Sequence, residues 1–177
     1  MKKGDLSIDF RLLRMACIRS SLCEPRGSLA DLRALNDADT AKKVVEIAEK
    51  LIDRGFVNIE AHATVVQAYT KLNDPAKAKF HLDVTTALIR SIMNSGDGKT
   101  KESAFEVICD REEYDTLAAL GLPYFGPTVT WVGGLKDGPH TFEKFQVQNP
   151  KTGQNVTVFF NIDNFSPLKS RPTGKYD

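Results

Sequence analysis

Cysteines are few in this sequence, and their arrangement excludes some kinds of site. The 177 residues include only Cys17, Cys23 and Cys109, and no two of them form a C-x-x-C pair. An odd number at these spacings indicates neither a zinc site nor a disulfide framework, so we expect small buried side chains. A bridge between Cys17 and Cys23 would require the chain to bend back between them, and the sequence leaves that pairing open.

Long apolar runs and a strong charge of one sign are also missing. No stretch approaches the roughly 20 apolar residues that a membrane span needs, and the basic start MKKGDLSIDF precedes no apolar signal segment. As written, the sequence predicts a cytoplasmic protein, or a periplasmic or secreted one if a leader was trimmed. The formal net charge of +1 gives no field that would favour nucleic acid as a partner.

Motifs of common hydrolases and metalloenzymes, such as H-E-x-x-H and G-x-S-x-G, are absent. The run Gly98-Lys99-Thr100 resembles the end of a nucleotide-binding P-loop. A P-loop requires a glycine where this sequence has Met93, and it follows a strand, whereas the pattern here predicts a helix. We therefore expect no nucleotide, cofactor or metal, and we interpret the glycines as ending a helix.

The first half of the chain carries helical patterns. Over residues 39–54, apolar side chains recur at helical spacing, and Gly55 follows as a stop signal. The predicted buried stripe consists of Ala41, Val44, Ala48 and Leu51. The next helix begins after Asn58, a good N-cap, and has apolar side chains on more than one side, which predicts burial. A third helix follows and ends near residue 95, and shorter helices are predicted over residues 7–22 and 28–35.

A weak internal repeat links two of these helices. The segment ALNDADTAKK (34–43) resembles KLNDPAKAKF (71–80), and Leu35 aligns with Leu72 at an offset of 37 residues. A tetratricopeptide helix pair repeats at about 34 residues. The pattern suggests a short tetratricopeptide-like stack.

Beyond residue 95 the pattern changes to strands. Alternating apolar residues predict strands over 128–132, 141–148 and 155–163, a run at 103–109 is compatible with strand or helix, and GGLKDGP (133–139) reads as a loose turn. A helix to residue 120 is predicted to begin with a capping box, in which Asp110 caps the Glu113 amide and Glu113 reaches back.

These patterns predict an α+β fold. An N-terminal tetratricopeptide-like helical half (residues 1–95) would pack on a small C-terminal antiparallel sheet with one helix (96–165) that shares its core. The last residues, 166–177, have little to bury and are expected to fray.

Few residues are candidates for chemistry, and none is assigned as catalytic. His81 is expected to be a hydrogen-bonded packing histidine like His62. Lys99 and the amides of the turn 96–100 are suited to holding an anion, with His81 or Glu113 moving a proton. In a purely structural alternative, Asp97 and Thr100 would bond to backbone amides.

The run SIMNSGDGKTKESAFEVICDREEYDTLAALGL (91–122) resembles the signature of an uncharacterised bacterial family, a domain of unknown function. The matching parts are S-G-D-G-K-T, S-A-F, V-I and E-E-Y, the last ending in Glu113-Tyr114. His81 stands at the family's histidine position, and the segments DF…LR near residue 9 and FFNID also match. Serine at position 103, where threonine is commoner, keeps the hydroxyl.

The resemblance covers most of residues 8–165 and supports a tetratricopeptide-like half joined to a mixed half. It implies that many relatives are exported, it supplies no activity, and it groups the turn 96–100, His81 and Glu113–Tyr114 as one site. We interpret the protein as a non-enzymatic protein- or peptide-interaction module, of the kind found in bacterial adaptor or immunity-type proteins, with Tyr124 and Trp131 as candidates for a contact face. The alternative is a small-ligand-binding protein or hydrolytic enzyme with its site at the turn.

Overall fold

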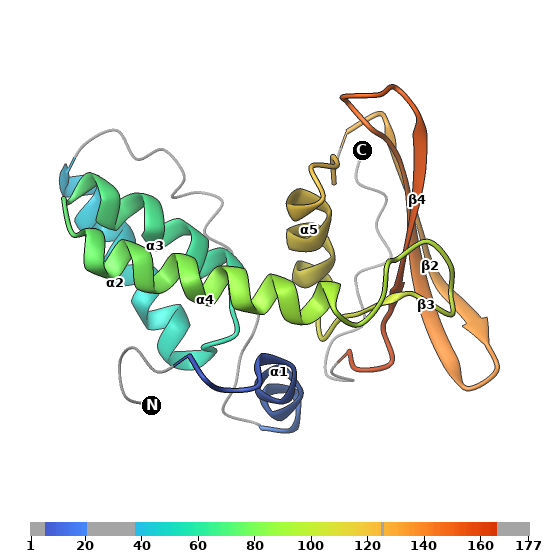
Figure 1. Cartoon of the computed structure of the whole chain (residues 1–177), viewed down its shortest axis with the longest axis horizontal. Helices are drawn as coiled ribbons and strands as arrows, with labels where there is room; N and C mark the ends of the chain where they lie inside the picture. Colours follow the sequence, from blue (N-terminus) through green and yellow to red (C-terminus); the bar gives the residue numbers. More distant parts are fainter. Residues whose placement is uncertain (1–5, 21–37, 125, 166–177) are drawn as a thin grey trace.

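The fold is α+β, as the sequence predicts. A computed structural model describes residues 6–20, 38–124 and 126–165, and within these ranges five helices and a four-stranded mixed sheet are present. In Figure 1, α4 runs from a stack of helices toward the sheet, and α5 lies between the two. The predicted helix at 28–35, Cys23 and the tail 166–177 lie outside the described residues.

The elements follow one another in a simple order. The helices are α1 (Phe10–Arg19), α2 (Ala38–Arg54), α3 (Ile59–Lys71), α4 (Pro75–Met93) and α5 (Asp110–Ala119). The strands are β1 (Phe105–Glu106), β2 (Val129–Asp137), β3 (His140–Gln148) and β4 (Asn155–Asn161).

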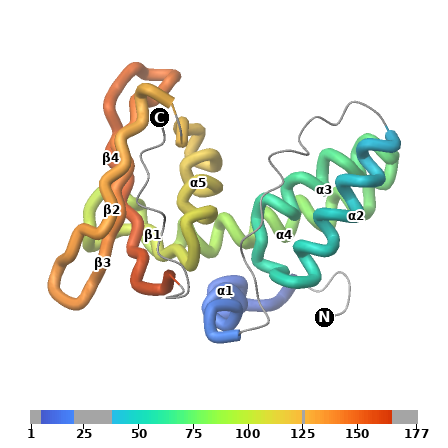
Figure 2. The backbone as a smooth tube through the Cα atoms, turned by 180° about the vertical axis from the view of Figure 1, so that it is seen from behind, coloured from blue at the N-terminus to red at the C-terminus, as the bar shows by residue number. Residues whose placement is uncertain are grey.

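Helices α2, α3 and α4 pack side by side, which Figures 1 and 2 show from opposite sides. Alanines make this close approach possible, since Ala41 and Ala48 of α2 and Ala61 and Ala68 of α3 are fully buried. The boundary at Asn58 is as predicted, because its Oδ1 accepts a hydrogen bond from the third amide of α3 at 2.9 Å.

The sheet has the strand order β1-β4-β3-β2. Strands β2, β3 and β4 form an antiparallel meander, and β1 adds a short parallel pairing to β4. The turn predicted over 133–139 is shorter than expected and occupies Gly138-Pro139, because β2 continues to Asp137 through a bulge between Val132 and Leu135. Gly134 has a positive φ of 67° at this point, which supplies the irregular backbone that a bulge requires.

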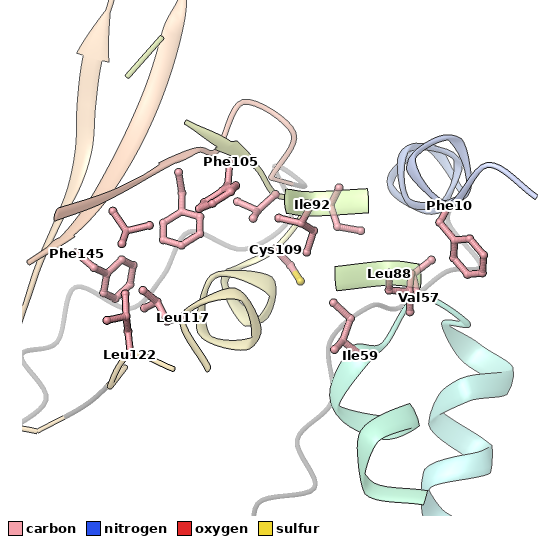
Figure 3. Packing of buried hydrophobic residues seen from close by; sticks show 14 of the residues in the cluster. Phe10, Val57, Ile59, Leu88, Ile92, Phe105, Cys109, Leu117, Leu122 and Phe145 are labelled. Atoms are coloured by element: carbon pink, nitrogen blue, oxygen red, sulfur yellow. The ribbon is translucent and has the colours of Figure 1, made fainter. Parts of the chain in front are cut away.

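One hydrophobic cluster runs from α1 to the sheet. Figure 3 shows Phe10 of α1 beside Leu88 of α4 at one end of it, and Phe145 of β3 beside Leu117 of α5 at the other. Because α4 supplies Val84, Leu88 and Ile92 to this cluster, this helix belongs to the shared core that joins the helical stack to the sheet. The remaining members, some of them drawn in Figure 3, are Cys17, Val57, Ile59, Phe105, Val107, Ile108, Cys109, Leu122, Val147, Val158 and Phe160.

Two of the cysteines fall within the described residues. Cys109 is free and buried in the cluster, and burial raises the pKa of its thiol, so it is not placed for nucleophilic chemistry. Cys17 is disulfide-bonded. The pairing with Cys23 that the sequence leaves open involves a residue outside the described part of the chain.

Candidate functional site

A cleft of about 580 Å³ opens between α1, the last turns of α4 and β1, and we call it the α1–α4 cleft. Most of the residues that line it have polar or charged side chains, Phe10 and Ala87 are apolar, and the carbon atoms of the polar side chains also contribute to its surface. The complete lining is Asp9, Phe10, Arg11, Ala87, Arg90, Ser91, Asn94, Ser95 and Glu106.

A buried ion pair lies next to this lining. Arg14 of α1 is 0% exposed, and its Nε and Nη2 atoms donate to the two carboxylate oxygens of Glu112 at 2.8 and 2.6 Å. Arg14 also donates to the Glu106 carbonyl at 2.8 Å and to the Ser91 hydroxyl at 3.3 Å. One guanidinium therefore ties α1, α4, β1 and α5 together, with charge-assisted hydrogen bonds in a bidentate geometry.

The edge of the cleft is held by a second set of contacts. Arg11 donates to the Glu106 carboxylate through Nε at 3.1 Å and Nη2 at 2.7 Å. The Ser95 hydroxyl accepts from the Glu106 amide at 2.8 Å, which fixes β1 against the end of α4. Asp9 accepts the amides of Arg11 and Leu12 as the N-cap of α1.

The stretches that carry the family resemblance meet at this cleft. The DF…LR segment supplies Asp9, Phe10 and the buried Arg14, the start of the 91–122 run supplies Ser91 to Ser95, and S-A-F-E-V-I supplies Glu106. Glu112 of the E-E-Y motif completes the buried ion pair. These segments are far apart in sequence, so their convergence at one place is a property of the fold.

The predicted turn 96–100 lies beside this cleft and is an internally bonded loop. Asp97 accepts from the Ser103 hydroxyl at 2.6 Å and from the Lys99 amide at 3.0 Å, and the Lys99 ammonium lies 3.1 Å from its other oxygen. The Ser103 hydroxyl, followed by Lys99, lowers the pKa of Asp97 from 3.8 to about 2. Thr100 and Ser103 bond to each other, and the Lys99 side chain is largely exposed.

Gly96 and Gly98 of the turn lie so close to neighbouring atoms that a side chain would not fit at either position. The Gly98 carbonyl accepts from the Phe159 amide of β4 at 2.8 Å, and a Cβ at Gly98 would overlap the buried ring of Phe105. A Cβ at Gly96 would overlap the backbone at Ser103. The turn therefore docks on β4, and side chains at the two glycines would prevent this.

Substituting Gly98 by alanine tests this docking. Gly98 and Gly121 have the same φ of 70°, but a Cβ at Gly121 meets open space. We expect Gly121→Ala to lower the free energy of unfolding by about 1 kcal/mol through backbone strain alone. Gly98→Ala adds the overlap with Phe105 and should cost about 2–4 kcal/mol in total, measured by urea denaturation. Equal losses in the two variants would contradict the docking.

His81 belongs to a buried network in the helical stack. Its Nδ1 lies 2.9 Å from Nδ1 of His62, whose Nε2 lies 2.9 Å from the Phe56 carbonyl. Because a carbonyl only accepts, His62 carries its proton on Nε2 and accepts from His81 at Nδ1. His81 Nε2 is 3.5 Å from Glu49, and its ring stacks on Tyr69. The expectation that both are hydrogen-bonded packing histidines agrees with these contacts.

The start of α5 differs from the predicted capping box. Cys109 is the N-cap, without a side-chain cap bond, and Asp110 is already helical. Glu112, rather than Glu113, reaches back, and it accepts the Ile108 amide at 2.9 Å. The reason is Arg14, which holds the Glu112 carboxylate at this end of the helix. Glu113 is fully buried in α5.

A second cavity, of about 320 Å³ between α3 and α5, brings together two of the predicted residues, Tyr114 and Tyr124. Their ring centroids are 5.9 Å apart. Arg111 bridges the helices there through a 2.6 Å ion pair to Glu60. Trp131 is on β2, is 45% exposed, and donates through Nε1 to Glu143 at 2.6 Å.

The structure does not gather His81, Lys99 and Glu113. His81 contacts side chains of the stack, Lys99 pairs with Asp97, and Glu113 is inside α5; none of them lines either of the two cavities. The sequence interpretation also missed Arg14 and Arg90. A signal for Arg14 existed: it follows Phe10 by four residues on the buried face of α1, where a charged side chain requires a partner.

These features define a small α+β protein with a polar cleft between a helical stack and a sheet. The family model described as a domain of unknown function, DUF4919, matches residues 26–127, more than half of the chain, and the chain belongs to this family. No curated protein and no solved structure matches it. The predicted membership of an uncharacterised family is therefore confirmed.

Two further observations concern the described residues only. None of their helices is both long and apolar enough to cross a lipid bilayer. In the same ranges, no group of three or more His, Cys, Asp or Glu side chains is placed to hold a metal ion.

Proposed function

We propose that this protein is a peptide- or protein-binding module and that the α1–α4 cleft is its binding site. The observation that carries the proposal is the convergence of residues 9–11, the segment 87–95 and Glu106 around one open cavity. The bidentate pair between Arg14 and Glu112 holds the surrounding elements in place. A cleft held in this way is preorganised, so a partner binds without a large ordering cost.

Exposed apolar side chains on α1 and α4, the two helices that border the cleft, support binding to a protein partner. Leu12 of α1 is 62% exposed, and Leu82 and Met93 of α4 are 51% and 38% exposed. Leu82 and Met93 are eleven residues apart, which places them on the same side of α4, and Arg90 lies between that side and the cleft. Apolar side chains beside a polar cavity are typical of interaction surfaces.

The arrangement of α2, α3 and α4 supports a tetratricopeptide-like helical half of one and a half to two units, with residues 96–165 as a cap. Stacks of this kind bury their own core and leave another face available to a peptide. A bacterial adaptor or immunity-type protein would use such a module, and this role rests on analogy of architecture.

A peptide-display selection tests the proposal. The immobilised protein is used to select binders from a random peptide library, and the affinities of the recovered peptides are measured for wild type and variants. We expect the double variant Leu82→Gln/Met93→Gln to weaken binding about tenfold or more, because the apolar contact beside the cleft is lost.

Ile47→Gln is the matched control for this experiment. Ile47 is 40% exposed on α2, a helix that contributes no residue to the lining of the cleft, whereas Leu82 and Met93 are on α4, which contributes several. It should change the affinities less than about twofold. If no peptide is recovered, or if the Ile47 variant and the double variant lose affinity equally, the cleft is not the binding site.

A further inference from the structure

Most polar groups in the α1–α4 cleft are already engaged. The Glu106 carboxylate is held by Arg11, and the Asp9 carboxylate accepts the first amides of α1. The hydroxyls of Ser91 and Ser95 donate to carbonyls within α4 at 2.7 and 2.5 Å. The two carboxylates and the two hydroxyl protons of the lining therefore have partners within the protein.

Arg90 and Asn94 are different. Among the described residues, neither side chain takes part in a hydrogen bond or an ion pair, although both line the cleft. They are four residues apart at the end of α4 and so face the same part of the cavity. Together they present a planar guanidinium with five N–H donors and a carboxamide with two more. The groups available to a ligand are thus mainly donors, and the charge among them is positive.

We propose that this cleft recognises a carboxylate, presented by an aspartate or glutamate side chain of a partner peptide that also carries apolar residues. The inference rests on the proposed function and specifies its partner. Arg90 would bind the carboxylate in the bidentate geometry that guanidinium and carboxylate share, and the Asn94 amide would donate to one oxygen. Apolar neighbours of the acidic residue would cover Met93, which is three residues from Arg90 on α4 and is 38% exposed.

Other partner chemistries fit these groups less well. A lysine or arginine of a partner would meet the charge of Arg90, which is repulsive, and would have the carboxylate of Asp9 to pair with, whose Oδ1 already accepts two amides of α1. A nucleic acid is held by several cations along its backbone, whereas one of the two arginines that line this cleft, Arg11, is already paired with Glu106. A single carboxylate flanked by apolar groups matches both the donors and the exposed apolar side chains.

The test is a titration of the ¹⁵N-labelled full chain with three blocked pentapeptides, acetyl-ALEAL-amide, acetyl-ALQAL-amide and acetyl-ALKAL-amide. We expect the glutamate peptide to shift the backbone amides of residues 90–95 and to bind at least about fivefold more tightly than the isosteric glutamine peptide. Raising sodium chloride from 50 to 500 mM should reduce that difference, because salt screens the pairing.

Two arginine variants test whether Arg90 is responsible for the preference for the glutamate peptide. Arg90→Gln should remove most of the preference for the glutamate peptide over the glutamine peptide, so that the ratio of the two affinities falls about fivefold. Because Arg90 is exposed, the substitution should leave the fold intact. Arg54→Gln is the matched control, because Arg54 is also an exposed arginine in the last turn of a helix, and it should leave the preference within about twofold.

Several outcomes would overturn the inference. If the glutamine or lysine peptide binds the cleft as well as the glutamate peptide, the carboxylate is not the recognised group, whereas the proposed binding module stands. If glutarate alone binds as tightly as the glutamate peptide, the cleft is a small-molecule carboxylate site rather than a peptide site. If no probe shifts the amides of residues 90–95, the cleft does not recognise this chemistry, and the display selection then decides whether it binds peptides at all.

Discussion

Replacing Arg14 by alanine is expected to lower the free energy of unfolding by about 3–5 kcal/mol. The guanidinium has no exposed surface and binds Glu112 through two hydrogen bonds, so its removal leaves a buried carboxylate without its counter-ion. The Glu106 carbonyl and the Ser91 hydroxyl lose a donor at the same time. Guanidinium chloride denaturation followed by circular dichroism measures the loss.

A neighbouring arginine provides the control for this substitution. Arg11, three residues earlier in α1, forms an ion pair whose side chains are 53% and 32% exposed, so Arg11→Ala should cost less than about 1 kcal/mol. A double variant, Arg14→Met with Glu112→Gln, removes both charges and keeps an acceptor for the Ile108 amide. It should be more stable than Arg14→Ala. Equal losses for Arg11→Ala and Arg14→Ala would show that burial of the ion pair is unimportant.

Acid should destabilise the protein through His62. Burial, followed by the neighbouring His81, lowers the pKa of His62 from 6.5 to about 4. Between these values the unfolded chain binds a proton that the folded protein does not, so stability falls as the pH is lowered. From pH 7 to pH 4.5 this histidine alone should remove about 2 kcal/mol from the free energy of unfolding.

The variant His62→Asn separates this effect from other titrations. Asparagine keeps an acceptor near the position of Nδ1 and does not titrate, so the decline in stability between pH 7 and pH 4.5 should be smaller in the variant. The comparison is between the two slopes, because His81, Glu49 and Tyr69 face the same network and are present in both proteins. His140→Asn, in an exposed histidine, should keep the wild-type contribution of His62. Parallel curves for wild type and His62→Asn would contradict the prediction.

The helical stack was predictable because a helix with one buried face has apolar residues at helical spacing in its own sequence. Ala41, Val44 and Ala48 are fully buried, as their spacing indicates. The next buried position is Ile52 rather than the predicted Leu51, since the helix repeat of 3.6 residues shifts the stripe. The cap at Asn58 was readable for the same reason, because its side chain bonds within the first turn of its own helix.

The cleft was not predictable in the same way. Its lining comes from segments that have no local relation, and the ion pair beside it joins residues 98 positions apart. Periodicity predicted a helix over residues 7–22, and α1 spans Phe10–Arg19 of that range, but periodicity could not show which carboxylate reaches Arg14. The same reason explains the wrong capping box, since the local pattern favours Asp110 as the cap with Glu113 three residues later and does not show that Arg14 pairs with Glu112.

Because Arg14 lies in α1, the unit that folds cooperatively is expected to be larger than the stretch that the family model matches. A polypeptide of residues 26–127 would retain Glu112 and lose its guanidinium partner, together with the strands whose Phe145 and Phe160 pack in the same cluster. Calorimetry of such a fragment should show no cooperative transition, whereas the whole chain should melt as one unit from α1 to β4. The stretch that the family model matches and the expected cooperative folding unit therefore begin and end at different residues.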